Sequence, residues 1–115
     1  LFTNGAMTVA NTIVWGNTTD IAMLGGPGTL VVSYSDIEDG WTGTGNLNAD
    51  PRFVDAANGD YHLDVGSSCI DKGTPVGAPT HDIEGTPRDS APDMGAYEWT
   101  GFRIFLPLVL RNVGP

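Results

Sequence analysis

Carboxylate and amide side chains gather in one short stretch of the sequence, where their oxygens could bind a cation. Asp50, Asp55, Asn58 and Asp60 lie close together in a segment rich in turn-forming residues. Oxygen ligands from such loops suit Ca²⁺, although the spacing does not follow the EF-hand pattern. Asp and Asn also stabilise turns by hydrogen-bonding to the neighbouring backbone. The sequence therefore predicts either a calcium site or a series of turns capped by side chains.

One aromatic side chain is placed to contact a carbohydrate. Trp41 follows Gly40 in a predicted turn, so we expect its indole at the surface, where an aromatic face can stack on a sugar ring. Trp15 instead follows the alternating pattern of a predicted strand and is expected in the core. The sequence therefore makes Trp41 the candidate for carbohydrate contact.

No group of residues in the sequence matches a catalytic centre. His62 and His81 are far apart in the sequence with no pair of cysteines nearby, which is not a metal-binding spacing. Neither a nucleophile elbow nor a P-loop is present. His62 is therefore expected on the solvent side of a strand, and Cys69, the single cysteine, as a small buried side chain. We assign no catalytic residue.

The charge balance and the length exclude several classes of protein. Fourteen acidic and five basic residues give a net charge of −9, which repels a phosphate backbone, so no nucleic-acid partner is expected. No apolar run approaches the roughly 18 residues of a membrane-spanning helix. The 115 residues are expected to form one domain, over residues 1–115.

The pattern of two apolar segments predicts two strands that stack on each other. Residues 7–15 and 30–37 both alternate apolar and polar positions, and sliding the first onto the second places Met7 on Val31 and Asn11 on Ser35. The Gly- and Pro-rich turn at 25–28 leaves no room for a crossover helix, so parallel pairing requires the chain to coil. Polar residues stacked at a corner could bond to backbone groups there.

The later segments divide into three parts. Residues up to 73 are expected to continue the coil, 74–99 to form a loop-rich wrap that ends in a short strand at 93–99, and 100–115 an apolar strand and tail. The residues expected to point inward in the later coils are Phe53, Tyr61, Leu63, Val65 and Ile70.

Six short motifs resemble one family of secreted bacterial proteins. They are Asn11-Thr-Ile-Val-Trp-Gly-Asn17, Tyr34-Ser-Asp-Ile-Glu38, Asp50-Pro-Arg-Phe-Val-Asp55, Gly59-Asp-Tyr-His-Leu63, Ser68-Cys-Ile-Asp-Lys-Gly73 and Asp93-Met-Gly-Ala-Tyr-Glu98. In this order they resemble the C-terminal part of right-handed parallel β-helix repeat proteins of the pectate-lyase-like superfamily, including "choice-of-anchor" domains. The resemblance implies an all-β fold, a short β-helix of about three to four rungs, and an extracellular or cell-surface location.

The same superfamily includes polysaccharide lyases and hydrolases, so a fragment of such an enzyme is an alternative function, as is a carbohydrate-binding β-helix. Lyases of this kind use a Lys or Arg base together with Ca²⁺. The present sequence has five basic residues that form no cluster. We therefore favour a non-catalytic protein.

The two ends of the predicted coil point to self-association. Strand 7–15 begins close to Leu1 with no capping segment before it, so its outer edge is expected to be open or covered by further coils of a longer protein. Near the other end, apolar residues occupy both faces of one strand, and such a strand needs a partner unless it folds back on its own coil. These residues are Phe102, Ile104, Phe105, Leu106, Leu108, Val109 and Leu110. The sequence thus predicts a structural surface protein that associates head to tail with copies of itself.

Overall fold

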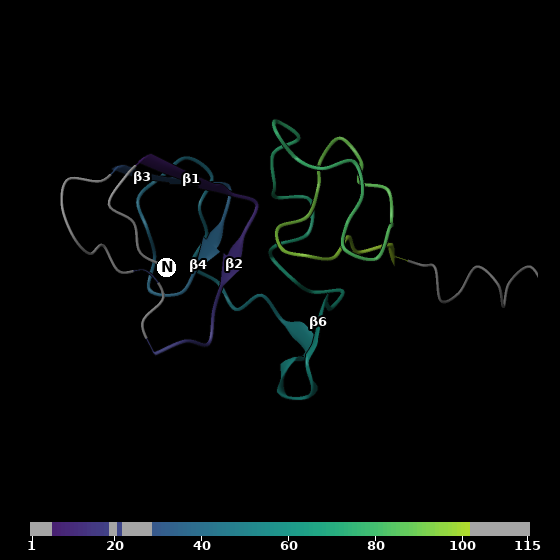
Figure 1. Ribbon diagram of the computed structural model, residues 1–115. Coiled ribbons are helices and arrows are strands. Elements are labelled where there is room, and N and C mark those ends of the chain that lie inside the picture. The colour runs from purple at the N-terminus through teal and green to yellow at the C-terminus, as the bar shows by residue number, and fades with distance from the viewer. Residues whose placement is uncertain (1–5, 19–20, 22–28, 102–115) are drawn as a thin grey trace, which may run out of the picture.

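The computed structural model describes residues 6–18, 21 and 29–101 and is built from short strands joined by turns (Figure 1). The strands are β1 (Ala6–Ala10), β2 (Ile13–Val14), β3 (Thr29–Ser33), β4 (Asp36–Ile37), β5 (Phe53–Asp55) and β6 (Asp60–Leu63). The one helical element in this part of the chain is a short 3-10 turn, η1 (Ala56–Asn58). None of the described residues lies in a helix long and apolar enough to cross a membrane. The protein is thus β-rich with almost no helix, as the sequence predicts.

The first four strands form two parallel ladders. Strand β1 pairs with β3 and β2 with β4, in one common register in which Ala6 faces Thr29 and Ile13 faces Asp36. Met7 therefore faces Leu30, so the predicted pairing of Met7 with Val31 is wrong by one position. Asn11 and Tyr34 both have left-handed backbone angles (φ +54° and +49°) and form the equivalent corners that follow β1 and β3. The alignment of these two corners sets the register.

Polar side chains at these corners bond to the backbone, as the sequence predicts. Ser35 is fully buried, and its hydroxyl accepts from the Thr12 N–H (3.2 Å) and donates to the Ser33 carbonyl (2.9 Å). The Asn46 amide reaches the same region, where its oxygen accepts from the Ser35 N–H (3.1 Å) and its nitrogen donates to the Val32 carbonyl (3.0 Å). Buried backbone groups beyond the ladders therefore keep their partners.

The following segment continues the parallel pairing through a single bridge. The N–H of Ile37 donates to the Leu47 carbonyl (2.9 Å), and that of Leu47 to the Ser35 carbonyl (2.8 Å), so Leu47 lies parallel to β4. The step from Asp36 to its partner Leu47 is about half as long as the step from Ile13 to Asp36. The sheets in the described part of the chain are therefore small and open.

The chain then departs from parallel pairing. Strands β5 and β6 form an antiparallel hairpin in which Phe53 faces Leu63. Leu63 is buried, whereas Tyr61 and Val65, both expected to point inward, are 49% and 68% exposed. The hairpin projects from the body of the molecule in Figure 1, so it has little core to cover Tyr61.

Residues 64–101 form a series of turns beside the parallel ladders (Figure 1). The short strand expected at 93–99 is not formed. Instead, the buried carboxylate of Asp93 accepts from the N–H groups of Asp71 (2.8 Å) and Trp99 (2.5 Å), so a side chain takes the place of a ladder. Cys69 is fully buried beside Leu63 and Met94, as predicted. The final apolar segment, 102–115, lies outside the described residues.

Asn11 connects the parallel ladders to these turns. Its side-chain oxygen accepts from the Thr74 N–H (2.7 Å), its side-chain nitrogen donates to the Thr74 carbonyl (2.8 Å), and its own carbonyl accepts from the Gly95 N–H (2.8 Å). Gly95 approaches so closely that a Cβ there would lie 2.8 Å from Ile13 Cδ1. The two parts of the molecule are therefore held in one fixed arrangement.

This arrangement predicts that Asn11→Gly destabilises the fold. Glycine retains the left-handed backbone but removes both side-chain bonds to Thr74, so the free energy of unfolding should fall by about 1–3 kcal/mol in urea denaturation. Asp39→Gly is the matched control, because Asp39 has a similar backbone (φ +67°) but is exposed. Equal losses for the two variants would show that the Asn11 side chain does not hold the two parts together.

Candidate functional site

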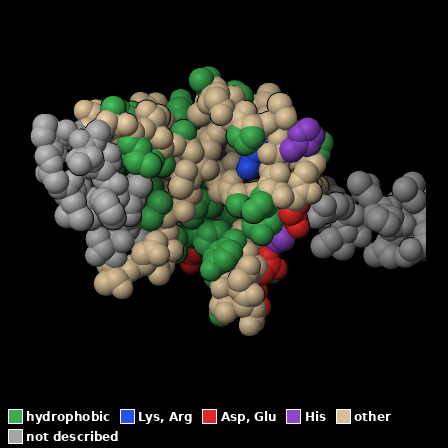
Figure 2. All heavy atoms as spheres, viewed as in Figure 1, with side chains coloured by type: hydrophobic (Ala, Val, Ile, Leu, Met, Phe, Trp, Pro, Cys, Tyr) green, Lys and Arg blue, Asp and Glu red, His purple; other side chains and the backbone are tan. Residues whose placement is uncertain are grey.

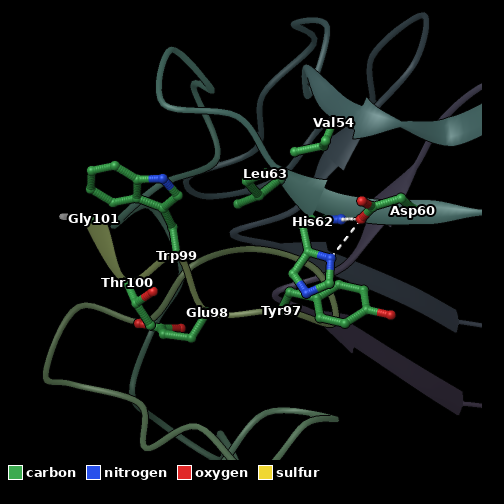
Figure 3. Close-up of a pocket in the computed structure, with 9 residues that line it drawn as sticks. All are labelled: Val54, Asp60, His62, Leu63, Tyr97, Glu98, Trp99, Thr100 and Gly101. Atoms are coloured by element: carbon green, nitrogen blue, oxygen red, sulfur yellow. Dashed lines mark hydrogen bonds and ion pairs between the residues drawn. The ribbon is translucent and has the colours of Figure 1, made fainter. Parts of the chain in front are cut away.

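Two adjoining hollows lie where the hairpin meets the C-terminal turns. The first, here called the His62 hollow, has a volume of about 290 Å³ and is lined by Val54, Asp60, His62, Leu63, Tyr97, Glu98, Trp99, Thr100 and Gly101 (Figure 3). The second, the Tyr61 hollow, has about 380 Å³ and is lined by Ile13, Val14, Trp15, Asn17, Phe53, Tyr61, Ile83, Gly95, Ala96 and Tyr97. Tyr97 belongs to both. The hollows therefore depend on the contact between the hairpin and the C-terminal turns.

The His62 imidazole is held between two carboxylates. Its Nδ1 lies 2.5 Å from Asp60 Oδ1 and its Nε2 lies 2.7 Å from Glu84 Oε1. Its ring stacks on that of Tyr97, with the centroids 3.9 Å apart and the planes at 30°. Carboxylates only accept hydrogen bonds when ionised, so these contacts favour the imidazolium, in which both ring nitrogens donate.

The charge of this group follows from the same contacts. The hydrogen bond to Asp60, and then the one to Glu84, raises the pKa of His62 above its ordinary value. The hydrogen bond from the His62 side chain in turn lowers the pKa of Asp60. The His62 side chain remains 36% exposed, so solvent screens these interactions. When His62 is protonated, its imidazolium therefore balances part of the negative charge of the two carboxylates.

This geometry is suited to binding more than to nucleophilic catalysis. A histidine that activates a nucleophile needs one ring nitrogen directed at a hydroxyl or thiol. Here both nitrogens bond to carboxylates, and the hydroxyls that line the His62 hollow belong to Tyr97 and Thr100. The Cys69 thiol is fully buried, donates to Asp36 (3.1 Å), and has its pKa raised mainly by burial.

The described basic side chains lie outside the linings of the two hollows. Arg88 is 10% exposed and pairs with Glu98 (2.8 Å), while Arg52 lies at the surface, 3.8 Å from Asp64. Lys72 is exposed. We find no Lys or Arg among the described residues that line either hollow.

The carboxylates proposed from the sequence as calcium ligands bond within their own turns. Asp50 accepts from the Arg52 N–H (2.8 Å), Asp55 accepts from the Asn58 amide (2.8 Å), and Asp60 accepts from His62. This is the arrangement expected of turn-capping side chains. A calcium ion bound to these four residues stays a prediction.

A different set of carboxylates comes together in space. Oxygens of Asp71, Asp93 and Glu98 lie within 4.8 Å of one another, and such a set could hold a cation. Burial raises the pKa of Asp93 to about 6. However, both Asp93 oxygens accept from N–H groups, and Glu98 Oε1 accepts from Arg88 and from the Asp93 N–H. These buried carboxylates therefore organise the surrounding backbone.

The aromatic candidate from the sequence lies elsewhere. Trp41 is half-buried and lines a separate hollow of about 260 Å³ with Glu38 and Asp39. Trp15, expected in the core, is also half-buried and lines the Tyr61 hollow. Trp41 and the His62 hollow are therefore not parts of one site.

Sequence reasoning missed most of the residues around His62. Asp60 and His62 could have been paired, because residues two apart on a strand lie on the same face. Glu84, Tyr97 and Trp99 approach them from distant positions that no local pattern reveals.

The contacts of His62 predict a pH-dependent contribution to stability. Because the folded-state pKa of His62 is raised, its contribution is complete below about pH 6.5 and is lost as the pH rises through the raised pKa. The melting temperature of the wild type should therefore exceed that of His62→Gln by about 1–3 °C at low pH, and by less at high pH. Melting curves between about pH 5.5 and about pH 9 would measure this difference.

His81→Gln supplies the control, because His81 is exposed and its Nδ1 is 2.9 Å from the hydroxyl of the adjacent Thr80. The same pH dependence in both variants would contradict the role given to the two carboxylates around His62.

Comparisons of the chain with protein-family models, with curated proteins and with solved structures gave no match.

Proposed function

We propose that this chain is a non-catalytic structural module of the parallel β-helix type, extracellular or at the cell surface, which associates head to tail with copies of itself. The observation that carries the proposal is the edge of β1. Among the described residues β1 pairs with β3 alone, so one side of this parallel ladder has no partner strand. An open strand edge is a template for another strand.

The parallel ladders support the β-helix part of the proposal. Both have the same register, and a left-handed corner lies between them, at Asn11 in one turn and at Tyr34 in the next. A repeat of this length is typical of a coiled chain. The shorter step to Leu47 and the antiparallel hairpin are departures from a regular coil.

The surface of β1 is compatible with strand addition. Ala6, Met7 and Thr8 are exposed, and no charged side chain lies in β1 to oppose a partner. Strand addition draws its free energy mainly from backbone hydrogen bonds, which an open edge provides in series. We assign the donor role to the apolar segment near the C-terminus, for which the sequence predicts a strand and which lies outside the described residues. Its residues are Phe102, Ile104, Phe105, Leu106, Leu108, Val109 and Leu110.

Proline substitutions in β1 test this edge directly. Successive residues of a strand direct their N–H groups to opposite sides. One of the two variants Thr8→Pro and Val9→Pro therefore removes a hydrogen bond to β3, and the other, the outward variant, removes an N–H group from the open edge. The outward variant should keep its melting temperature but lose association, with the average mass in light scattering falling to that of the monomer.

Two results would refute self-association through this edge. One is a wild-type chain that is monomeric at every concentration in sedimentation analysis. The other is association that is unchanged both by the outward proline and by deletion of residues 102–115.

Carbohydrate binding is a second candidate, and the Tyr61 hollow favours it. Four aromatic side chains line this hollow, namely Trp15, Phe53, Tyr61 and Tyr97. Tyr61 is 49% exposed and packs edge-on against Phe53 (centroids 5.1 Å apart), which fixes its ring. Figure 2 shows hydrophobic side chains gathered where the hairpin joins the rest of the molecule. Exposed aromatic faces beside polar groups suit the apolar face and hydroxyl edge of a sugar.

This candidate predicts that Tyr61→Ala weakens retention on a glycan array at least about fivefold, since it removes an aromatic face. Trp41→Ala is the informative comparison, because the sequence alone assigns the sugar contact to Trp41. Loss of retention with Trp41→Ala but not with Tyr61→Ala would move the contact away from the Tyr61 hollow.

A further inference from the structure

We propose that the His62 hollow binds an organic ammonium ion, a primary or quaternary ammonium group carried on a small apolar body. This site is independent of the proposed self-association, since it lies on the hairpin and the C-terminal turns and not on β1. It also differs from the Tyr61 hollow, which has no charged side chain in its lining.

The walls of the hollow offer both an aromatic surface and an apolar surface. Figure 3 shows the Trp99 indole and the His62 imidazole on different sides of the hollow, with Leu63 between them and Glu98 and Thr100 on the side opposite Leu63. Trp99 lines the hollow, and we assign its indole to the ligand. Indole is the aromatic group that attracts cations most strongly.

The charges around the hollow favour a cation. Asp60 and Glu98 line it, and Glu84 adjoins it through its bond to His62. The Arg88 guanidinium pairs with Glu98 Oε1 (2.8 Å) and balances its charge, so Asp60 and Glu84 supply the negative charge available to a ligand. With a net charge of −9 on the chain, the surrounding field also attracts cations.

His62 sets the pH at which the site is most receptive. The groups that face its ring are Asp60 on β6, Glu84 from the C-terminal turns, and the ring of Tyr97. While His62 is an imidazolium, it balances part of the negative charge of these carboxylates. When it loses its proton at higher pH, that balance is lost, so an ammonium ion should bind more tightly.

The size of the hollow limits the ligand. Its volume of about 290 Å³ is at the lower end of the range of about 300–1,000 Å³ for small-molecule pockets. A single ammonium head group with a short chain suits such a space, and a folded protein domain does not. The ammonium group could belong to a choline head group or to a lysine side chain, and both share the chemistry that the site recognises.

Titration by NMR would test the proposal on the full chain. The probes are choline, its uncharged isostere 3,3-dimethylbutan-1-ol, and N-acetyl-lysine-methylamide as the peptide source of an ammonium group. At least one of the two ammonium probes should shift the Trp99 indole and Thr100 amide signals saturably. It should bind at least about fivefold more tightly than the isostere, and more tightly at about pH 8.5 than at about pH 6. The tighter of the two ammonium probes identifies the source.

Variants assign the binding to its parts. Trp99→Leu should weaken binding about fivefold or more, because it keeps an apolar side chain but removes the aromatic face, whereas Trp99→Phe should retain most of it. Trp41→Leu is the control for loss of an indole elsewhere. Asp60→Asn should weaken ammonium binding and leave any binding of the isostere unchanged.

Three results would overturn the inference. These are equal affinity for choline and its isostere, unchanged binding in Trp99→Leu, and the absence of saturable shifts at Trp99 and Thr100 with either ammonium probe at about 50 mM, a concentration that would nearly saturate a site with a dissociation constant of about 1 mM. If Trp99→Leu fails to fold, the comparison of the probes on the wild type and on Asp60→Asn still decides the question.

Discussion

The structure depends on the hydrogen bonds of one residue, Asn11. Its N–H donates to the Tyr34 carbonyl (3.1 Å), its carbonyl accepts from the Gly95 N–H, and its side chain makes a reciprocal pair with Thr74. The first bond closes the corner between the parallel ladders, and the others position the turns that carry Tyr97 and Trp99. Because the hollows lie between those turns and the hairpin, their shape follows from this corner.

In much of the C-terminal part of the molecule, backbone N–H groups bond to side-chain carboxylates where a sheet would bond them to a neighbouring strand. Asp82 accepts from the N–H groups of Glu84, Thr86 and Glu98, and Asp93 serves two further N–H groups. A buried backbone donor without a partner costs about as much as a lost hydrogen bond. These carboxylates therefore make an irregular fold possible, and acidic residues that first suggest cation binding have this structural task.

Part of the fold follows from the sequence because local rules determine it. Alternating apolar residues give the parallel strands, and Ser35 and Cys69 are buried as their neighbours indicate. The register predicted from the sequence is wrong by one position, because the corner is set by backbone angle at Asn11 and Tyr34 and not by matching polar side chains. Tyr61 is exposed because it lies in an antiparallel hairpin. A pattern of parallel strands does not predict such a hairpin.

The site is less predictable than the fold, because its parts meet only in three dimensions. The pairing of Asp60 with His62 is local, whereas Glu84 is distant from His62 in the sequence and reaches it through the turn built on Asp82. Neither composition nor spacing indicates that contact.

We propose that the open edge of β1 receives a strand from another copy of the chain, and amide hydrogen exchange at several protein concentrations would detect this pairing. The outward-facing amides of β1 should gain protection as the concentration rises, whereas those that bond between β1 and β3 should not change. Protection of the β1 amides that is the same at every concentration would contradict it.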